Sequence, residues 1–190
     1  MNELEPLSAQ TISSKRVHEG RRISLRIDEF RLGDKPPAVK EIIEHPGGVV
    51  ILPVTDHGTV LLIRQWRQAA HSILLECPSG TREPGEPPEV SAHRELREEA
   101  GVRAERLIPL GGNWVAPGYS SEFTYGFLAT GLTPDPLPQD DGEDIHVVEV
   151  PVEDIPQMIR TGELQDQMTI AVYYAAMYVF KTEEATKTLG

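Results

Sequence analysis

Four glutamates stand at fixed intervals in one short stretch of the chain. Glu86 follows Gly80 by six positions, and Glu95, Glu98 and Glu99 close the stretch. On a helix these last three occupy positions i, i+3 and i+4, so their carboxylates lie on one face. Like charges this close repel one another unless cations neutralise them, and a set of carboxylate oxygens is what Mg²⁺ or Mn²⁺ accepts. The spacing therefore predicts a divalent-metal site.

A helix must present three of these acids. The Pro87-Pro88 pair suits a first helical turn, where a missing N–H costs nothing, and Gly101 suits the left-handed residue beyond a last turn. We therefore expect a helix from Pro87 to Ala100.

A glycine-containing loop precedes this helix. Gly80 and the Pro84-Gly85 pair let the chain turn sharply, so that backbone carbonyls can approach the same metal ions. Arg94 can hold Glu86 in place. An acidic helix on its own is usually a solvated surface with i, i+4 ion pairs, but the upstream Gly80 and Glu86 favour the metal-binding interpretation.

The stretch from Gly80 to Val102 resembles the Nudix box at every position that the box defines. Other segments resemble the ADP-ribose pyrophosphatase branch of that family, over about residues 20 to 175. These segments are Glu44–Gly48, Arg64–Arg67, Leu74–Gly80 and Ala116–Glu122. The resemblance implies an α/β/α sandwich with a mixed sheet, two or three Mg²⁺ ions, and a water positioned to attack a pyrophosphate.

The resemblance also assigns roles within the box. Glu95, Glu99 and Glu98, with the backbone carbonyl of Ser79, match the metal ligands, and Glu98 and Glu99 are the acids on which turnover should depend most. Glu86 and Arg94 match residues that hold the loop on the helix, and such supporting contacts orient metal ligands.

The base that activates water comes, in the resembled branch, from an acidic loop after the box. Here that loop is Asp140–Asp144, in which Glu143 is the first candidate and Asp141 the second. An acidic loop is often only solvated, and a metal-bound water can ionise with little further help.

Substrate contacts follow from the same resemblance. Arg67 would reach phosphate oxygens, Glu122 a ribose hydroxyl, and Pro117 would lie in the substrate-binding Pro-Gly segment, although charged residues of this kind are also ordinary members of surface ion pairs. Two departures concern the substrate. Cys77 and Ser79 replace leucine or valine and alanine, and Tyr119 lies near a tyrosine of dinucleoside-polyphosphate hydrolases.

Composition restricts the remaining possibilities. The chain has 190 residues, 39% of them hydrophobic, a formal net charge of −12 and a single cysteine. We expect one main core and no membrane association, because no apolar run is long enough to span a bilayer. The acidic charge disfavours nucleic-acid binding. Without a signal-peptide pattern or a possible intrachain disulfide, a cytoplasmic location is expected.

We expect no catalytic role for the cysteine and no zinc site among the histidines. Cys77 lies in an apolar strand, where a small buried thiol is expected, and the six histidines show no zinc-site spacing.

The rest of the chain predicts a sheet covered by helices. We expect a small N-terminal antiparallel β unit over residues 1–46, a Nudix hydrolase domain over 47–182 and a frayed tail over 183–190. The expected strands are 23–27, 39–44, 49–54, 60–66, 73–77, 107–110, 122–129 and 145–150, and the further helices are 152–161 and 167–180.

The expected reaction is Mg²⁺-dependent hydrolysis of ADP-ribose, or a related nucleoside diphosphate sugar, to AMP and a sugar phosphate. The alternatives are a dinucleoside polyphosphate or GDP-sugar substrate, or a noncatalytic nucleotide sensor. The partner is thus a small molecule, and family habit suggests a homodimer. Sequence does not fix the metal count, the phosphorus attacked or whether the N-terminal unit is exchanged between subunits.

Overall fold

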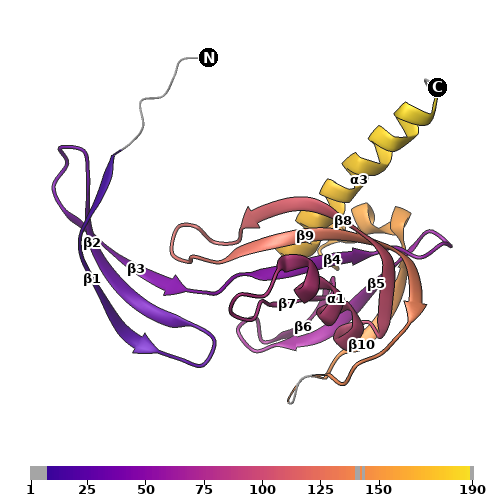
Figure 1. Ribbon diagram of the computed structural model, residues 1–190, viewed down its shortest axis with the longest axis horizontal. Helices are drawn as coiled ribbons and strands as arrows, with labels where there is room; N and C mark the ends of the chain where they lie inside the picture. Colours follow the sequence, from indigo (N-terminus) through magenta and orange to yellow (C-terminus); the bar gives the residue numbers. More distant parts are fainter. Residues whose placement is uncertain (1–7, 140–141, 143, 189–190) are drawn as a thin grey trace. The chain divides into compact units, whose positions relative to one another are not determined.

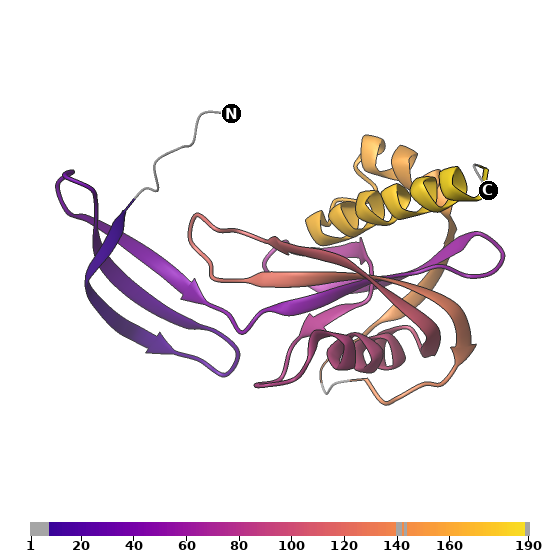
Figure 2. The same ribbon diagram turned by 45° about the horizontal axis from the view of Figure 1, so that its top comes forward.

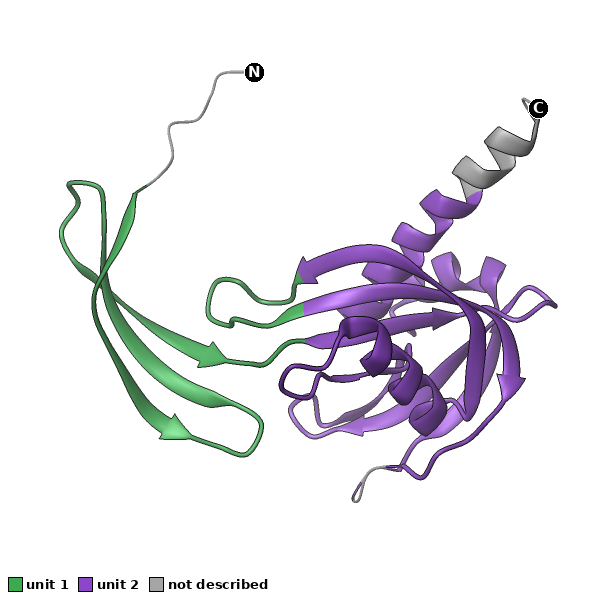
Figure 3. Ribbon diagram, in the orientation of Figure 1, with its two compact units in different colours: residues 1–47, 114–123 green, residues 48–113, 124–190 purple. Residues whose placement is uncertain are grey.

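The computed structural model describes residues 8–139, 142 and 144–188, with side chains described up to Phe180. The chain divides into two compact units, which are coloured separately in Figure 3. The first unit takes residues up to Gly47 together with Trp114–Phe123, and the second takes Gly48–Asn113 and the residues from Thr124 onwards.

The first unit is built on a three-stranded antiparallel sheet. Its strands are β1 (Ala9–Glu19), β2 (Ser24–Leu32) and β3 (Ala38–Glu44), in the order β1-β2-β3. The pairing of β2 with β3 was predicted from sequence, but β1 was not. Every side chain of β1 is exposed, so this strand lacks the alternation of buried and exposed residues that marks a strand in a sequence.

The second unit contains two sheets. A four-stranded sheet has the order β7-β4-β9-β8, and a three-stranded antiparallel sheet has the order β10-β5-β6. The larger sheet is mixed, as predicted, because β4 pairs in parallel with β9 and antiparallel with β7. The strands are β4 (Gly48–Pro53), β5 (Thr59–Arg67), β6 (Ser72–Glu76), β7 (Ser79–Thr81), β8 (Val102–Trp114), β9 (Phe123–Pro134) and β10 (His146–Pro151).

Helices cover both faces of the mixed sheet, as Figures 1 and 2 show. Helix α1 (Pro88–Glu99) lies on one face, while α2 (Ile155–Thr161) and α3 (Gln167–Thr188) lie on the other. A single 3₁₀ turn, η1 (Val152–Asp154), leads into α2. This is the predicted α/β/α sandwich.

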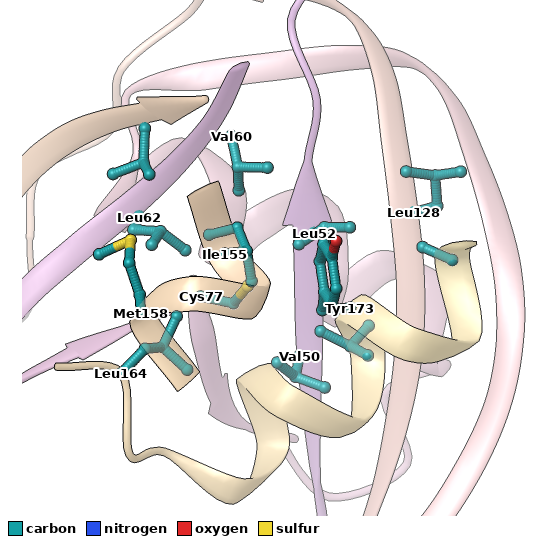
Figure 4. Close-up of a cluster of buried hydrophobic side chains, with 13 residues drawn as sticks. Val50, Leu52, Val60, Leu62, Cys77, Leu128, Ile155, Met158, Leu164 and Tyr173 are labelled. Atoms are coloured by element: carbon teal, nitrogen blue, oxygen red, sulfur yellow. The ribbon is translucent and has the colours of Figure 1, made fainter. Parts of the chain in front are cut away.

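Strand β4 shows how the sequence produces two cores. All six of its residues are buried, which is typical of a central strand covered on both faces. Val49 and Ile51 pack with residues of α1, whereas Val50 and Leu52 pack with residues of α2 and α3, because side chains alternate along a strand. Figure 4 shows the second of these clusters.

The box helix has the ends that the sequence predicted. Its N-cap is Pro87 and its C-cap is Ala100, and Gly101 then adopts a φ of +68°. Helix α3 continues to Thr188, beyond the predicted end at Phe180. Among the described residues, no helix is long and apolar enough to cross a membrane.

Candidate active site

One guanidinium gathers three of the predicted acids. The Nη1 group of Arg94 donates to Oε1 of Glu95 at 2.6 Å and to Oε2 of Glu98 at 2.9 Å. Its Nε and Nη2 groups donate to the two carboxylate oxygens of Glu86 at 3.3 and 3.2 Å, and Nη2 also reaches the Thr81 carbonyl. Although burial opposes it, the hydrogen bond to Glu86 and the charge of Glu95 raise the pKa of Arg94.

Glu86 is the anchor of the loop. Besides Arg94, it accepts hydrogen bonds from the Ser91 hydroxyl at 2.6 Å and from the Glu83 backbone N–H at 3.1 Å. The hydrogen bond from Arg94, helped by the one from Ser91, lowers the pKa of Glu86 to about 2 against the opposing effect of burial. The structure thus brings Glu86 and Arg94 together, and their supporting role stays a prediction.

A side chain at position 80 would displace Glu95. A Cβ on Gly80 would overlap the carboxylate of Glu95, so this side chain lies directly against the Gly80 backbone. The neighbouring Ser79 N–H donates to Oε2 of Glu99 at 2.6 Å. Glu95 and Glu99 are only 8% and 4% exposed, so the box brings two buried carboxylates to the short strand β7.

The donor set suits a hard divalent cation, which prefers carboxylate and carbonyl oxygens. Buried carboxylates need a compensating charge, and the lack of a side chain at Gly80 leaves the backbone open to Glu95. Arg94 supplies this charge to Glu95 and Glu98, while Glu99 is turned towards the Ser79 N–H. Within the described ranges, no group of three acidic, histidine or cysteine side chains already converges as a metal cage.

Arg67 lies at the end of β5 and is bound to a residue that sequence reasoning missed. Its Nε donates to both carboxylate oxygens of Glu76 at 3.0 Å, and its Nη2 donates to Oε2 at 2.5 Å. Glu76 is the last residue of β6 and is only 2% exposed. A lone acid inside the apolar run Ile73–Cys77 was the available signal.

The other two predicted substrate contacts, Glu122 and Pro117, belong to the first unit. Oε1 of Glu122 lies 3.9 Å from Nδ1 of His45, and this ring nitrogen accepts a hydrogen bond from the Gly47 N–H. Pro117 lies in a turn that is closed by hydrogen bonds from the Tyr119 and Ser120 N–H groups to the Ala116 carbonyl. The candidate bases Glu143 and Asp141 fall outside the described residues.

Cys77 is fully buried in the core, and burial raises the pKa of its thiol far above the ordinary value. The burial of this thiol was predicted, and a thiol that stays protonated is a poor nucleophile.

The sequence profile of the NUDIX domain matches residues 44–171. The chain therefore belongs to the Nudix family, and the family predicted from the box is confirmed. Nudix hydrolases generally use divalent metal ions, in agreement with the donor set of the box helix.

Individual relatives match most of the chain. The chain is 32% identical over 178 residues to the ADP-ribose pyrophosphatase of Bacillus subtilis (strain 168), and the aligned region covers 93% of this chain and 95% of the relative. It is 34% identical over 165 residues to the ADP-ribose pyrophosphatase of Mycobacterium tuberculosis (strain H37Rv), covering 85% and 80%. A crystal structure described as an ADP compounds hydrolase has the same fold, with a TM-score of 0.83 at 22% identity over 95% of this chain and 98% of the other.

Proposed function

We propose that the chain is a Nudix hydrolase that splits the pyrophosphate of ADP-ribose, or of a related nucleoside diphosphate sugar, into AMP and ribose 5-phosphate or the corresponding sugar phosphate. The observation that carries this proposal is the complete acid set of the box, with Glu86, Glu95 and Glu98 gathered by Arg94 and Glu99 bound to the Ser79 N–H. The two relatives named ADP-ribose pyrophosphatases, each similar over most of its length, support the substrate class.

Glu95, Glu98, Glu99 and the Ser79 carbonyl are the groups that would hold Mg²⁺, with Mn²⁺ as a substitute. When bound, the metal offsets the charge of the pyrophosphate and lowers the pKa of a coordinated water. Glu98 and Glu99 are then the acids whose removal should slow turnover most.

The protein itself supplies orientation. Arg94 ties the loop acid Glu86 to the helix acids Glu95 and Glu98, so loop and helix keep one arrangement. Glu143, or failing that Asp141, is proposed to accept the proton of the attacking water. If metal coordination alone ionises that water, neither acid is needed.

Three residues are proposed to contact the substrate. Arg67 would bind phosphate oxygens, Glu122 would accept a hydrogen bond from a ribose hydroxyl, and Pro117 would line the site. The Arg67 side chain is 38% exposed, so its guanidinium can meet a ligand from solvent.

Product analysis tests the proposal directly. The protein would be incubated with ADP-ribose, GDP-mannose, diadenosine polyphosphates and a nucleoside triphosphate, each with Mg²⁺ and with a chelator. Rapid AMP release from ADP-ribose that the chelator abolishes is the expected result. Equal rates with and without chelator would contradict the metal-dependent mechanism.

A dinucleoside polyphosphate is the second candidate substrate. Tyr119 is 59% exposed, so its ring is available to stack on a second base. Faster turnover of diadenosine polyphosphates than of ADP-ribose would favour this candidate and keep the mechanism. A nucleotide sensor would instead bind ADP-ribose without cleaving it.

We also propose a cytoplasmic homodimer that forms through the N-terminal unit. This unit exposes four apolar residues, Ile12, Val17, Ile23 and Val39, each 44–64% exposed. A second copy of the chain could bury them. Light scattering should give the mass of two chains. The substitution Val39→Lys should shift the mass towards one chain, whereas the exposed polar change Ser13→Asn should not.

A further inference from the structure

The contact between Arg67 and Glu76 is directional. Glu76 binds the side edge of the guanidinium, which consists of Nε and Nη2. In the part of the chain that the structure describes, the Arg67 side chain makes hydrogen bonds only to Glu76, and none of them uses Nη1. Because a guanidinium has five N–H donors, its Nη1–Nη2 edge keeps enough donors for a second two-pronged contact.

The burial of the two partners is unequal. The Glu76 side chain is 3% exposed and that of Arg67 is 38% exposed. The acid is therefore embedded in the protein, and the base projects from it towards solvent. Hydrogen bonds to Glu76 raise the pKa of Arg67 despite its partial burial, and the charges of Glu76, Glu99 and Asp166 act in the same direction.

The backbone beside Glu76 is itself fixed. The N–H of the next residue, Cys77, donates to the Thr169 hydroxyl at 2.7 Å, and that hydroxyl donates to Asp166 at 2.7 Å. Thr169 is fully buried near the start of α3. The end of β6 is thus attached to the first turn of α3, and Glu76 has little freedom to move.

A buried ion pair adds little net stability, because desolvation offsets most of its attraction. A fixed acid that leaves one edge of a half-exposed guanidinium free is better suited to orienting that guanidinium. Planar, two-pronged contact with phosphate is the arrangement that arginine provides and lysine does not.

We propose that Glu76 is a positioning residue that holds the free Nη1–Nη2 edge of Arg67 towards the phosphate oxygens of a nucleoside diphosphate. This inference rests on the proposed function in taking a nucleoside diphosphate as the ligand. It adds a specificity determinant outside the box.

Calorimetric binding of ADP in the presence of Mg²⁺, followed by ADP-ribose kinetics, tests the role. The variants are Glu76→Gln, Arg67→Lys and the double variant. The control is Glu149→Gln, which changes an exposed acid of the same three-stranded sheet. Glu149 accepts a hydrogen bond from the half-buried Thr59. Melting temperatures are measured for every variant.

Glu76→Gln should weaken ADP binding about tenfold and raise KM for ADP-ribose similarly, while kcat stays within about twofold. In the Arg67→Lys background, the same change should have almost no further effect, because Glu76 acts through the arginine fork. Glu149→Gln should bind ADP like the unchanged protein.

Three results obtained with the variants would overturn the inference. These are unchanged ADP binding in Glu76→Gln, additive losses in the double variant, and a loss of kcat in proportion to unfolded protein with KM unchanged. Failure of the wild-type protein to bind ADP would also overturn the inference. Binding of ADP that depends on Glu76, without hydrolysis of ADP-ribose, would instead refute only the proposed function.

Discussion

At the scale of single residues, the site depends on a missing side chain as much as on charged ones. Gly80 pairs with Val49 in the sheet and lies under the Glu95 carboxylate, where a methyl group would overlap it. The glycine therefore sets the position of one predicted metal ligand.

The substitution Gly80→Ala should displace Glu95 and reduce kcat/KM for ADP-ribose by about 100-fold, since small misplacements of reacting groups are this costly. Steady-state kinetics and circular dichroism would measure activity and fold together. Gly58→Ala is the control, because Gly58 has open space around its Cβ position, although its φ of +78° gives it a backbone penalty that Gly80 does not have. It should lower stability and leave activity unchanged.

Glu98→Gln and Glu99→Gln should each reduce kcat by at least about 100-fold, because each removes a charge from the proposed metal-binding set. Glu89→Gln provides the comparison, since Glu89 is an exposed acid in the first turn of the same helix. Near-normal turnover in both test variants would contradict the assignment of Glu98 and Glu99 to the metal-binding set.

At the scale of elements, the ion pair between Glu86 and Arg94 holds the loop of the box against its helix, and the strength of this contact depends on pH. The pKa of Glu86 is lowered from 4.5 to about 2, so its ionised form stabilises the folded state. That stabilisation is fully present above pH 4.5 and is lost as the pH falls towards 2. Its size is on the order of 3 kcal/mol, from about 1.4 kcal/mol for each pKa unit.

Urea unfolding at several pH values between 6 and 3 would measure this effect. The free energy of unfolding should fall with pH in the unchanged protein and fall less steeply in Glu86→Gln, which has no carboxylate to titrate. Parallel curves for the two proteins would contradict the assignment.

The hydrogen bond from the Cys77 N–H to the Thr169 hydroxyl attaches the end of β6 to α3. Thr169→Val keeps the shape of the side chain but leaves the buried Cys77 N–H without its acceptor. The expected loss is about 1–3 kcal/mol in the free energy of unfolding. Thr161→Val, at the exposed end of α2, removes a hydroxyl that bonds only to nearby helix carbonyls and should cost less.

At the scale of the whole molecule, sequence predicted what depended on local spacing or on runs of apolar residues. The helix that carries Glu95, Glu98 and Glu99 was expected from the spacing of its acids, and the central strand β4 was expected because it is a short continuous apolar run. Strand β1 was missed because its side chains are all exposed. Strand β8 extends beyond the predicted residues 107–110 at both ends: Gly111–Trp114 are exposed, and the earlier part buries only Ala104.

Individual side-chain partners were harder to predict than helices and strands. The pairing of Arg94 with Glu86 was expected, but its contacts with the neighbouring Glu95 and with Glu98 were not. The partner of Arg67 lies nine positions away on the next strand. The register of β5 with β6 sets Arg67 opposite Ser72 and Glu76 opposite Ile63, so the contact depends on two long side chains and not on cross-strand pairing.

The hairpin of β8 and β9 belongs to both units, because its closed end, Trp114–Phe123, groups with the N-terminal residues. The Ile43 N–H donates to the Tyr119 carbonyl at 2.8 Å, and the Ser121 N–H donates to the Ile43 carbonyl at 2.9 Å. A chain shortened to begin after residue 46 would therefore lose more than a tail. It would leave Tyr119 and Ser121 without these backbone partners, so the segment that holds Pro117 and Glu122 would keep its shape less well.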